Sequence, residues 1–139
     1  MTRTGPATPV DPALARGRLD NARAFFTAAS NAVALADPHD NANPILTQIV
    51  SAAIAYTDAL TARYSGVINR QDHAAARKAL RAALGNRLPK AQDRQLARIL
   101  ERKDEAQYGF RHGSLTEAAR LLRELENFAS WAESEFAKP

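Results

Sequence analysis

The residues best suited to chemistry gather in one stretch, ERKDEAQYGFRH, from Glu101 to His112. Its Lys103 and Tyr108 could bind a phosphate and stack on a base, and its His112 could transfer a proton if a substrate came within hydrogen-bond reach. The chain has no cysteine, and it has no G-x-S-x-G, P-loop, G-x-G-x-x-G or H-E-x-x-H motif. The motifs therefore predict no catalytic residue, no cofactor and no metal site.

The three histidines, His39, His73 and His112, are far apart in the sequence. His73 follows Asp72, and this pair could form a pH-sensitive ligand site. A polar first turn of a helix is the simpler interpretation of the same two residues, and we favour it. We expect His112 to lie in a loop.

Positive charge is concentrated in the third quarter of the chain. Residues 70–111 carry eleven Lys and Arg against five Asp and Glu, whereas residues 1–69 balance and the remainder is net negative. A local excess of this size attracts phosphates and acidic partners. The composition leaves a second interpretation open, because fifteen Arg against four Lys in an alanine-rich chain is also typical of GC-rich coding.

Helix signals recur along the whole chain, and its 139 residues suit one domain. Residues 1–10 are expected to form a disordered arm and residues 11–139 a single helical domain. Asp11-Pro12 and Asn43-Pro44 predict helix starts, with ends near Ala36 and Tyr64. Further helices are predicted over about 71–84, from Pro89 to a break at Gly109, and from the capping box SLTE at Ser114 to the C-terminus. The fold class is all-α, an up-and-down bundle of four to five helices.

The helical periods also predict which side chains are buried. Phe25 and Phe26 of the first helix are both expected to be buried. The remaining predicted interior residues are Leu19, Ala22, Ala29, Val33, Ala36, Ile45, Ile49, Ala53, Tyr56, Leu60, Ala76, Leu80, Ala83, Leu84, Leu96, Ile99, Leu100, Ala106, Leu115, Ala118, Leu122, Leu125, Ala129, Ala132 and Phe136. No stretch alternates with a period of two, so no strand is predicted.

The helix after Pro89 carries its cations in two ways. Lys90, Arg94, Arg98 and Arg102 are four residues apart and are expected to form one stripe opposite the apolar face, either as ordinary solvated arginines or as a surface that tracks phosphates. Lys103 falls near the centre of the apolar face instead. It must extend its ammonium to water, pair with an acid or face a binding cleft, because burying an unpaired charge is costly.

Two stretches resemble the HEPN superfamily of small helical bundles. SAAIAYTDALTARYSGVINRQDHAAARKAL, residues 51–80, is similar to the second helix of the family, followed by a glycine and an Asp-His pair. KDEAQYG, from Lys103 to Gly109, resembles the R-x-x-A-D-Y signature of one branch, with Lys103 in the arginine place, Gln107 in the aspartate place and Tyr108 in the tyrosine place. The resemblance covers about residues 12 to 136, and it implies a four- to five-helix bundle that is usually dimeric.

Many HEPN proteins are metal-independent ribonucleases that use an R-x4-6-H motif. No histidine of this chain has an arginine at the required distance before it. We therefore expect a non-catalytic, cytoplasmic homodimer that binds RNA, a nucleotide-bearing ligand or a nucleotidyltransferase-type or toxin–antitoxin partner, with no membrane span. The expected contact residues are Lys103, Tyr108, Arg102, Arg98, Arg94 and His73. A ribonuclease with a variant site, and a structural or antitoxin-like bundle, remain alternatives.

Overall fold

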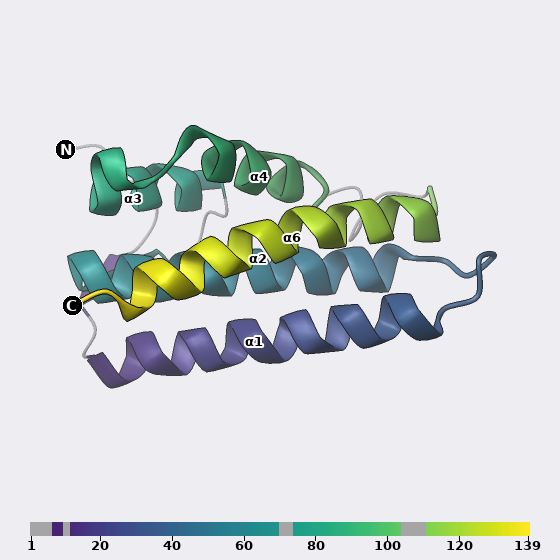
Figure 1. Cartoon of the computed structure of the whole chain (residues 1–139), viewed down its shortest axis with the longest axis horizontal. Coiled ribbons are helices and arrows are strands. Elements are labelled where there is room, and N and C mark those ends of the chain that lie inside the picture. The colour runs from purple at the N-terminus through teal and green to yellow at the C-terminus, as the bar shows by residue number, and fades with distance from the viewer. Residues whose placement is uncertain (1–6, 10–11, 70–73, 104–110) are drawn as a thin grey trace.

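The protein is an all-α helical bundle (Figure 1). The computed structural model describes residues 7–9, 12–69, 74–103 and 111–139. The α-helices of this part are α1 (Pro12–Leu35), α2 (Asn43–Ser65), α3 (Ala74–Leu84), α4 (Lys90–Glu101) and α6 (Leu115–Ala137). A 3-10 turn, η1 (Gly85–Arg87), links α3 to α4. The predicted fold class is confirmed.

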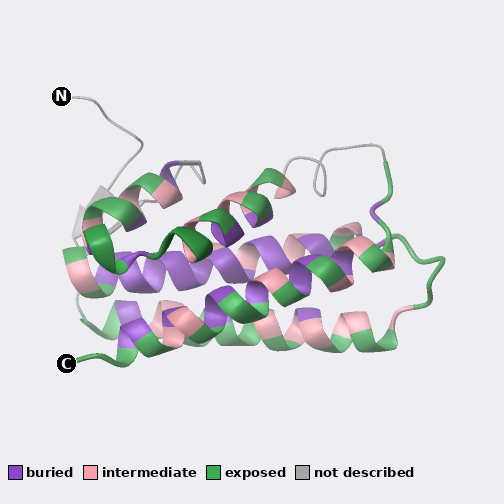
Figure 2. Cartoon of the chain, turned by 45° about the horizontal axis from the view of Figure 1, so that its top comes forward, coloured by how far each residue is buried: buried purple, intermediate pink, exposed green. Residues whose placement is uncertain are grey.

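Helix α2 is the centre of the bundle. It packs against α1, α3, α4 and α6, and α1 lies on the opposite side of it from the α3–α4 pair (Figure 1). Figure 2 shows that buried residues run along most of its length. By length and composition α2 could cross a membrane, but most of it is buried inside the bundle, as in the core helix of a soluble protein.

Most of the predicted interior residues are buried. All five predicted positions of α2, from Ile45 to Leu60, belong to the core, and so do Leu80, Leu96, Ile99 and the repeating apolar positions of α6 from Ala118 to Phe136, whereas Leu115 is half-buried. Phe25 was predicted wrongly, because its side chain is 40% exposed. At about 100° per residue it lies roughly 80° from the buried line of Ala15, Leu19, Ala22 and Ala29.

The predicted helix ends are largely confirmed. Pro12 is the first residue of α1, and Pro89 is the N-cap of α4. α2 ends at Ser65, and its C-cap is Gly66, whose φ of 71° is left-handed. The capping box of α6 is present, since Ser114 Oγ accepts from the Glu117 amide at 3.1 Å and Glu117 Oε1 accepts from the Ser114 amide at 3.2 Å. The start predicted at Gln71 and the break predicted at Gly109 lie outside the described residues.

Asn43 does not cap α2, in contrast to the prediction. Ala42 is the N-cap, and the Asn43 side chain bonds to the segment before α6. Its Oδ1 accepts from the Gly113 amide at 2.8 Å, and its Nδ2 donates to the Arg111 carbonyl at 3.0 Å. The side chain that sequence reasoning assigned to a local cap therefore joins two distant segments.

A short strand pair was not predicted. β1 (Ala7–Pro9) pairs antiparallel with β2 (Val67–Asn69), with Thr8 opposite Ile68. Residues 7–9 of the expected disordered arm are thus paired, and the rest of the arm lies outside the described residues. Strands of three residues are too short to show a period of two.

Candidate nucleic-acid interface

Helix α4 has a buried face and an outer face. Gln95, Leu96 and Ile99 are buried against the bundle, whereas Lys90 and Arg94 are exposed. At about 100° per residue, Lys90 and Arg94 lie roughly opposite the middle of the buried face. These two cations are therefore placed as the sequence predicts.

The other two arginines of the predicted stripe face α6. Arg98 Nη2 donates to Glu124 Oε2 at 2.8 Å, and Arg102 Nη2 donates to Glu117 Oε2 at 2.6 Å. Residues four apart advance by about 40° around a helix, so a row of four turns through roughly 120°. The predicted stripe is therefore not uniform, because the row turns toward the glutamates of α6: Arg98, whose side chain is still 50% exposed, and Arg102 form ion pairs there.

These two ion pairs line an open groove of about 220 Å³ between α4 and α6. Arg120 and Glu101 also line it, so its lining holds as many carboxylates as cations. A polyanion entering this groove would meet carboxylates as well as guanidinium groups. The groove is therefore a poorer phosphate site than the outer face of α4.

Asp93, in the first turn of α4, holds α3 and α4 together. Its carboxylate accepts hydrogen bonds from Nε and Nη2 of Arg77, both at 3.1 Å, and from Nη2 of Arg81 at 2.7 Å. The hydrogen bonds from Arg77, together with the one from Arg81, lower the pKa of Asp93, while its partial burial opposes this decrease. One carboxylate thus neutralises only one of two guanidinium charges.

The α3–α4 segment keeps a large positive excess after these pairings. Residues 74–103 contain nine Lys and Arg against Asp93 and Glu101. Lys78, Lys90 and Arg94 are exposed, and no carboxylate of the described residues forms an ion pair with them. We call Lys78, Lys90 and Arg94, together with Arg77 and Arg81 around Asp93, the basic face.

The predicted contact residues do not form one described cluster. Lys103 is half-buried at the end of the α4 segment. Tyr108, Ala106 and His73 lie outside the described residues, so the cleft expected between Lys103 and Tyr108 stays a prediction. Of the six predicted residues, Arg94 and Arg98 are both exposed, but Arg98 and also Arg102 pair with glutamates of α6, whereas Arg94 pairs with no carboxylate of the described residues.

Sequence reasoning missed the glutamates that determine which arginines are available. Glu117 was predicted in its capping role alone, yet its second carboxylate oxygen accepts from Arg102. Nothing in the spacing relates Glu117 or Glu124 to α4, because the pairing depends on how α6 packs.

The described histidines are both at the surface. His39 is exposed in the turn between α1 and α2, and His112 is exposed before α6. Within the described ranges, no three His, Asp or Glu side chains are grouped as a metal ion would require. The Lys and Arg side chains of the basic face can therefore bind anions.

Comparison of the chain with protein-family models finds no family that matches. Comparison with curated proteins finds no relative that matches. The HEPN resemblance, the homodimer and the cytoplasmic location therefore stay predictions.

Proposed function

We propose that this chain is a non-catalytic helical-bundle protein that binds RNA through its basic face. The observation that carries the proposal is the charge excess of α3 and α4, of which Lys78, Lys90 and Arg94 are exposed and not paired with a carboxylate of the described residues. The resemblance to HEPN domains, many of which act on RNA, supports the same conclusion.

A polymer with repeated phosphates suits this arrangement better than a single anion. The charges are spread over two helices, and Lys78 and Lys90 are flexible point charges that can follow a backbone of variable shape. Binding of this kind releases counterions, with a slope of log K against log salt of about −0.7 for each phosphate neutralised on a single strand. Three to four contacts therefore correspond to a slope of roughly −2 to −3.

The test is a mobility-shift titration of the purified protein with mixed cellular RNA across a salt series. The proposal expects binding that weakens steeply with salt and RNA that remains intact on a denaturing gel. Replacing Lys78, Lys90 and Arg94 together by Gln should abolish the shift. The matched control is Arg123→Gln, which removes one exposed cation from α6 outside the basic face.

The other outcomes point to the remaining function classes. Shortened RNA that depends on Lys103 or Tyr108 would favour a ribonuclease with a variant site. Absence of binding at low salt would overturn the proposal and favour a protein partner, such as a nucleotidyltransferase-type protein that docks on the bundle.

A further inference from the structure

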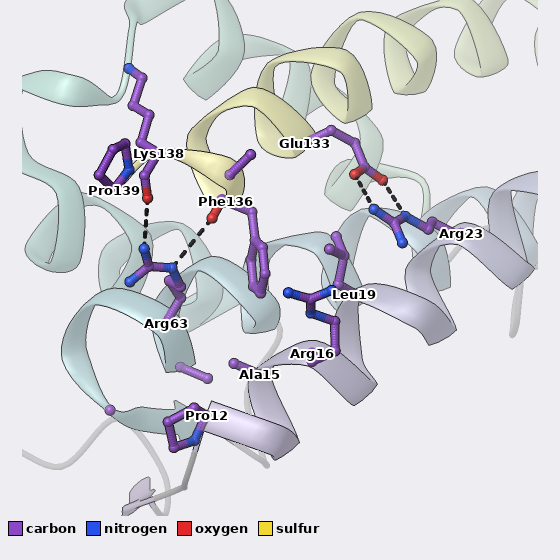
Figure 3. Close-up of a pocket in the computed structure, with 13 residues that line it drawn as sticks. Pro12, Ala15, Arg16, Leu19, Arg23, Arg63, Glu133, Phe136, Lys138 and Pro139 are labelled. Atoms are coloured by element: carbon purple, nitrogen blue, oxygen red, sulfur yellow. Dashed lines mark hydrogen bonds and ion pairs between the residues drawn. The ribbon is translucent and has the colours of Figure 1, made fainter.

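A cavity of about 690 Å³ lies at one end of the bundle, away from the basic face. It is formed by the N-terminal half of α1 and the C-terminal ends of α2 and α6, and no residue of α3 or α4 lines it (Figure 3). Its apolar wall includes Ala15, Leu19, Ala62 and Phe136. The volume falls within the range of roughly 300–1,000 Å³ that is typical of small-molecule sites.

The charged wall of the cavity is mostly cationic. The side chains of Arg16, Arg23 and Arg63 line it, against Glu133. Lys138 lines it as well, but its ammonium pairs with Glu135 at 2.5 Å. The Glu133 carboxylate already accepts two hydrogen bonds from Arg23, from its Nε at 2.8 Å and its Nη2 at 2.6 Å. The hydrogen bonds to Glu133 raise the pKa of Arg23, so its guanidinium group stays protonated.

Two of the cations have no carboxylate partner within the described residues. Arg63 Nε donates to the Phe136 carbonyl at 3.3 Å, and its Nη2 donates to the Lys138 carbonyl at 2.7 Å. These carbonyls hold the guanidinium in place without neutralising its charge. The guanidinium carbon of Arg16 lies 5.7 Å from the centre of the Phe136 ring. Figure 3 shows the Phe136 side chain between these two arginines.

We infer that this cavity binds a small organic anion with an apolar body. Arg16 would bind a carboxylate or a phosphate monoester, since a planar guanidinium group fits both, and the charge of Arg63 on the other side of Phe136 would add to the positive potential of the cavity. The alanine and leucine side chains and the Phe136 ring would cover the apolar part of the ligand. Because the cavity and the basic face share no residue, this inference does not depend on RNA binding.

The binding test is an amide NMR titration of the full chain with phenyl phosphate, benzoate and phenol as probes. Saturable shifts that map to residues such as Leu19, Ala62 and Ala137 are expected for the two anions. Phenol, which has the same ring without a strong charge, should bind at least tenfold more weakly. Comparing the affinities of phenyl phosphate and benzoate shows whether the site prefers a phosphate ester or a carboxylate.

Two surface substitutions make the test specific. Arg16→Gln should weaken anion binding by roughly tenfold or more, because a charge-assisted contact is lost. Ala137→Glu, which adds a carboxylate at an exposed lining position, should abolish binding, whereas Ala137→Gln should retain it. Arg94→Gln should leave the probes unaffected while it weakens RNA binding.

The inference is overturned if the shifts of phenyl phosphate and benzoate fail to saturate at millimolar concentration or map outside the cavity. It is also overturned if Arg16→Gln and Ala137→Glu both bind these anions as well as the unchanged protein. Since neither position is buried, both variants should fold.

Discussion

Arg98 Nη2 lies 2.8 Å from Glu124 Oε2, and this ion pair joins α4 to α6. One turn further along α4, Arg102 pairs with Glu117 in the same way at 2.6 Å. The side chains are partly exposed and screened by water, so these pairs contribute little to stability. Their larger consequence concerns binding, because each glutamate withdraws one arginine from the charge available to an anionic ligand.

Removing Glu124 should therefore strengthen RNA binding. Glu124→Gln frees the Arg98 guanidinium and removes one repelling carboxylate, so one further phosphate can be neutralised. We expect the slope of log K against log salt to steepen by about 0.7, together with a higher affinity at low salt. Fluorescence anisotropy with a labelled single-stranded RNA measures both quantities.

The matched control for this prediction is Glu126→Gln. Glu126 is exposed on α6, about 200° around the helix from Glu124, and so lies away from α4. An equal gain in affinity for both variants would show that only net charge matters, and that the ion pair to Arg98 has no specific effect.

Asp93 should make the stability of the bundle depend on pH. Its pKa is lowered by the hydrogen bonds from Arg77 and Arg81. A carboxyl group with a lowered folded pKa stabilises the protein above its unfolded pKa of about 3.9, and this contribution is lost as the pH falls through the folded pKa. Asp93→Asn should cost about 1 kcal/mol in the free energy of unfolding at pH 7.

The difference between Asp93→Asn and the unchanged protein should then shrink as the pH is lowered below 4. Urea unfolding at pH 7 and at pH 3 measures it. A constant difference between the two proteins across this range would mean that Asp93 acts through its shape and not through its charge.

The elements of the bundle could be predicted from the sequence because their signals are local. Proline after Asp11, the αL glycine at Gly66 and the capping box at Ser114 each act within one or two helical turns, and the structure has a helix boundary at each described site. Most buried positions follow from the same local periods.

The candidate site was harder to predict because it depends on how the helices pack. The sequence places Arg98 and Arg94 in one row, but the row turns around α4, and only the position of α6 decides that Arg98 meets Glu124. Asn43 shows the same limit, since its side chain could cap α2 locally and instead bonds to Gly113, 70 positions away. The anion cavity has no sequence signal, because α1, α2 and α6 contribute its residues from distant parts of the chain.

The Arg18–Asp58 pair predicts a second pH dependence, of opposite sign. Asp58 is buried in α2 and accepts from Arg18 Nη2 at 2.8 Å. Burial raises the pKa of Asp58, and the charge and hydrogen bond of Arg18 act against that increase. A carboxyl group with a raised folded pKa binds more protons in the folded state, so its contribution to stability declines as the pH rises from the unfolded to the folded pKa.

Arg18→Gln should leave this carboxylate buried without its cation. We expect a loss of about 3 kcal/mol in the free energy of unfolding at pH 7, because an uncompensated buried charge is costly. The loss should be smaller at pH 4, where protonation of Asp58 removes the charge. Urea unfolding at the two pH values tests this, and a loss that is equal at both would contradict the electrostatic explanation.

Two glycines should respond to alanine with opposite signs. A Cβ at Gly113 would lie 2.5 Å from Leu46 Cδ1 and 3.0 Å from Asn43 Oδ1, inside the contact that joins the segment before α6 to α2. Leu46 is 1% exposed and cannot move outward, so Gly113→Ala should cost about 1–3 kcal/mol in the free energy of unfolding.

Gly17 is the matched control, because it lies inside α1 and a Cβ there meets no atom within 4 Å. Gly17→Ala should stabilise the protein by about 0.5–1 kcal/mol, since alanine loses less backbone entropy in a helix. Thermal unfolding of both variants gives the comparison directly. If Gly113→Ala were as stable as Gly17→Ala, the segment before α6 would have room for a methyl group, and its close contact with Leu46 would not restrict residue 113 to glycine.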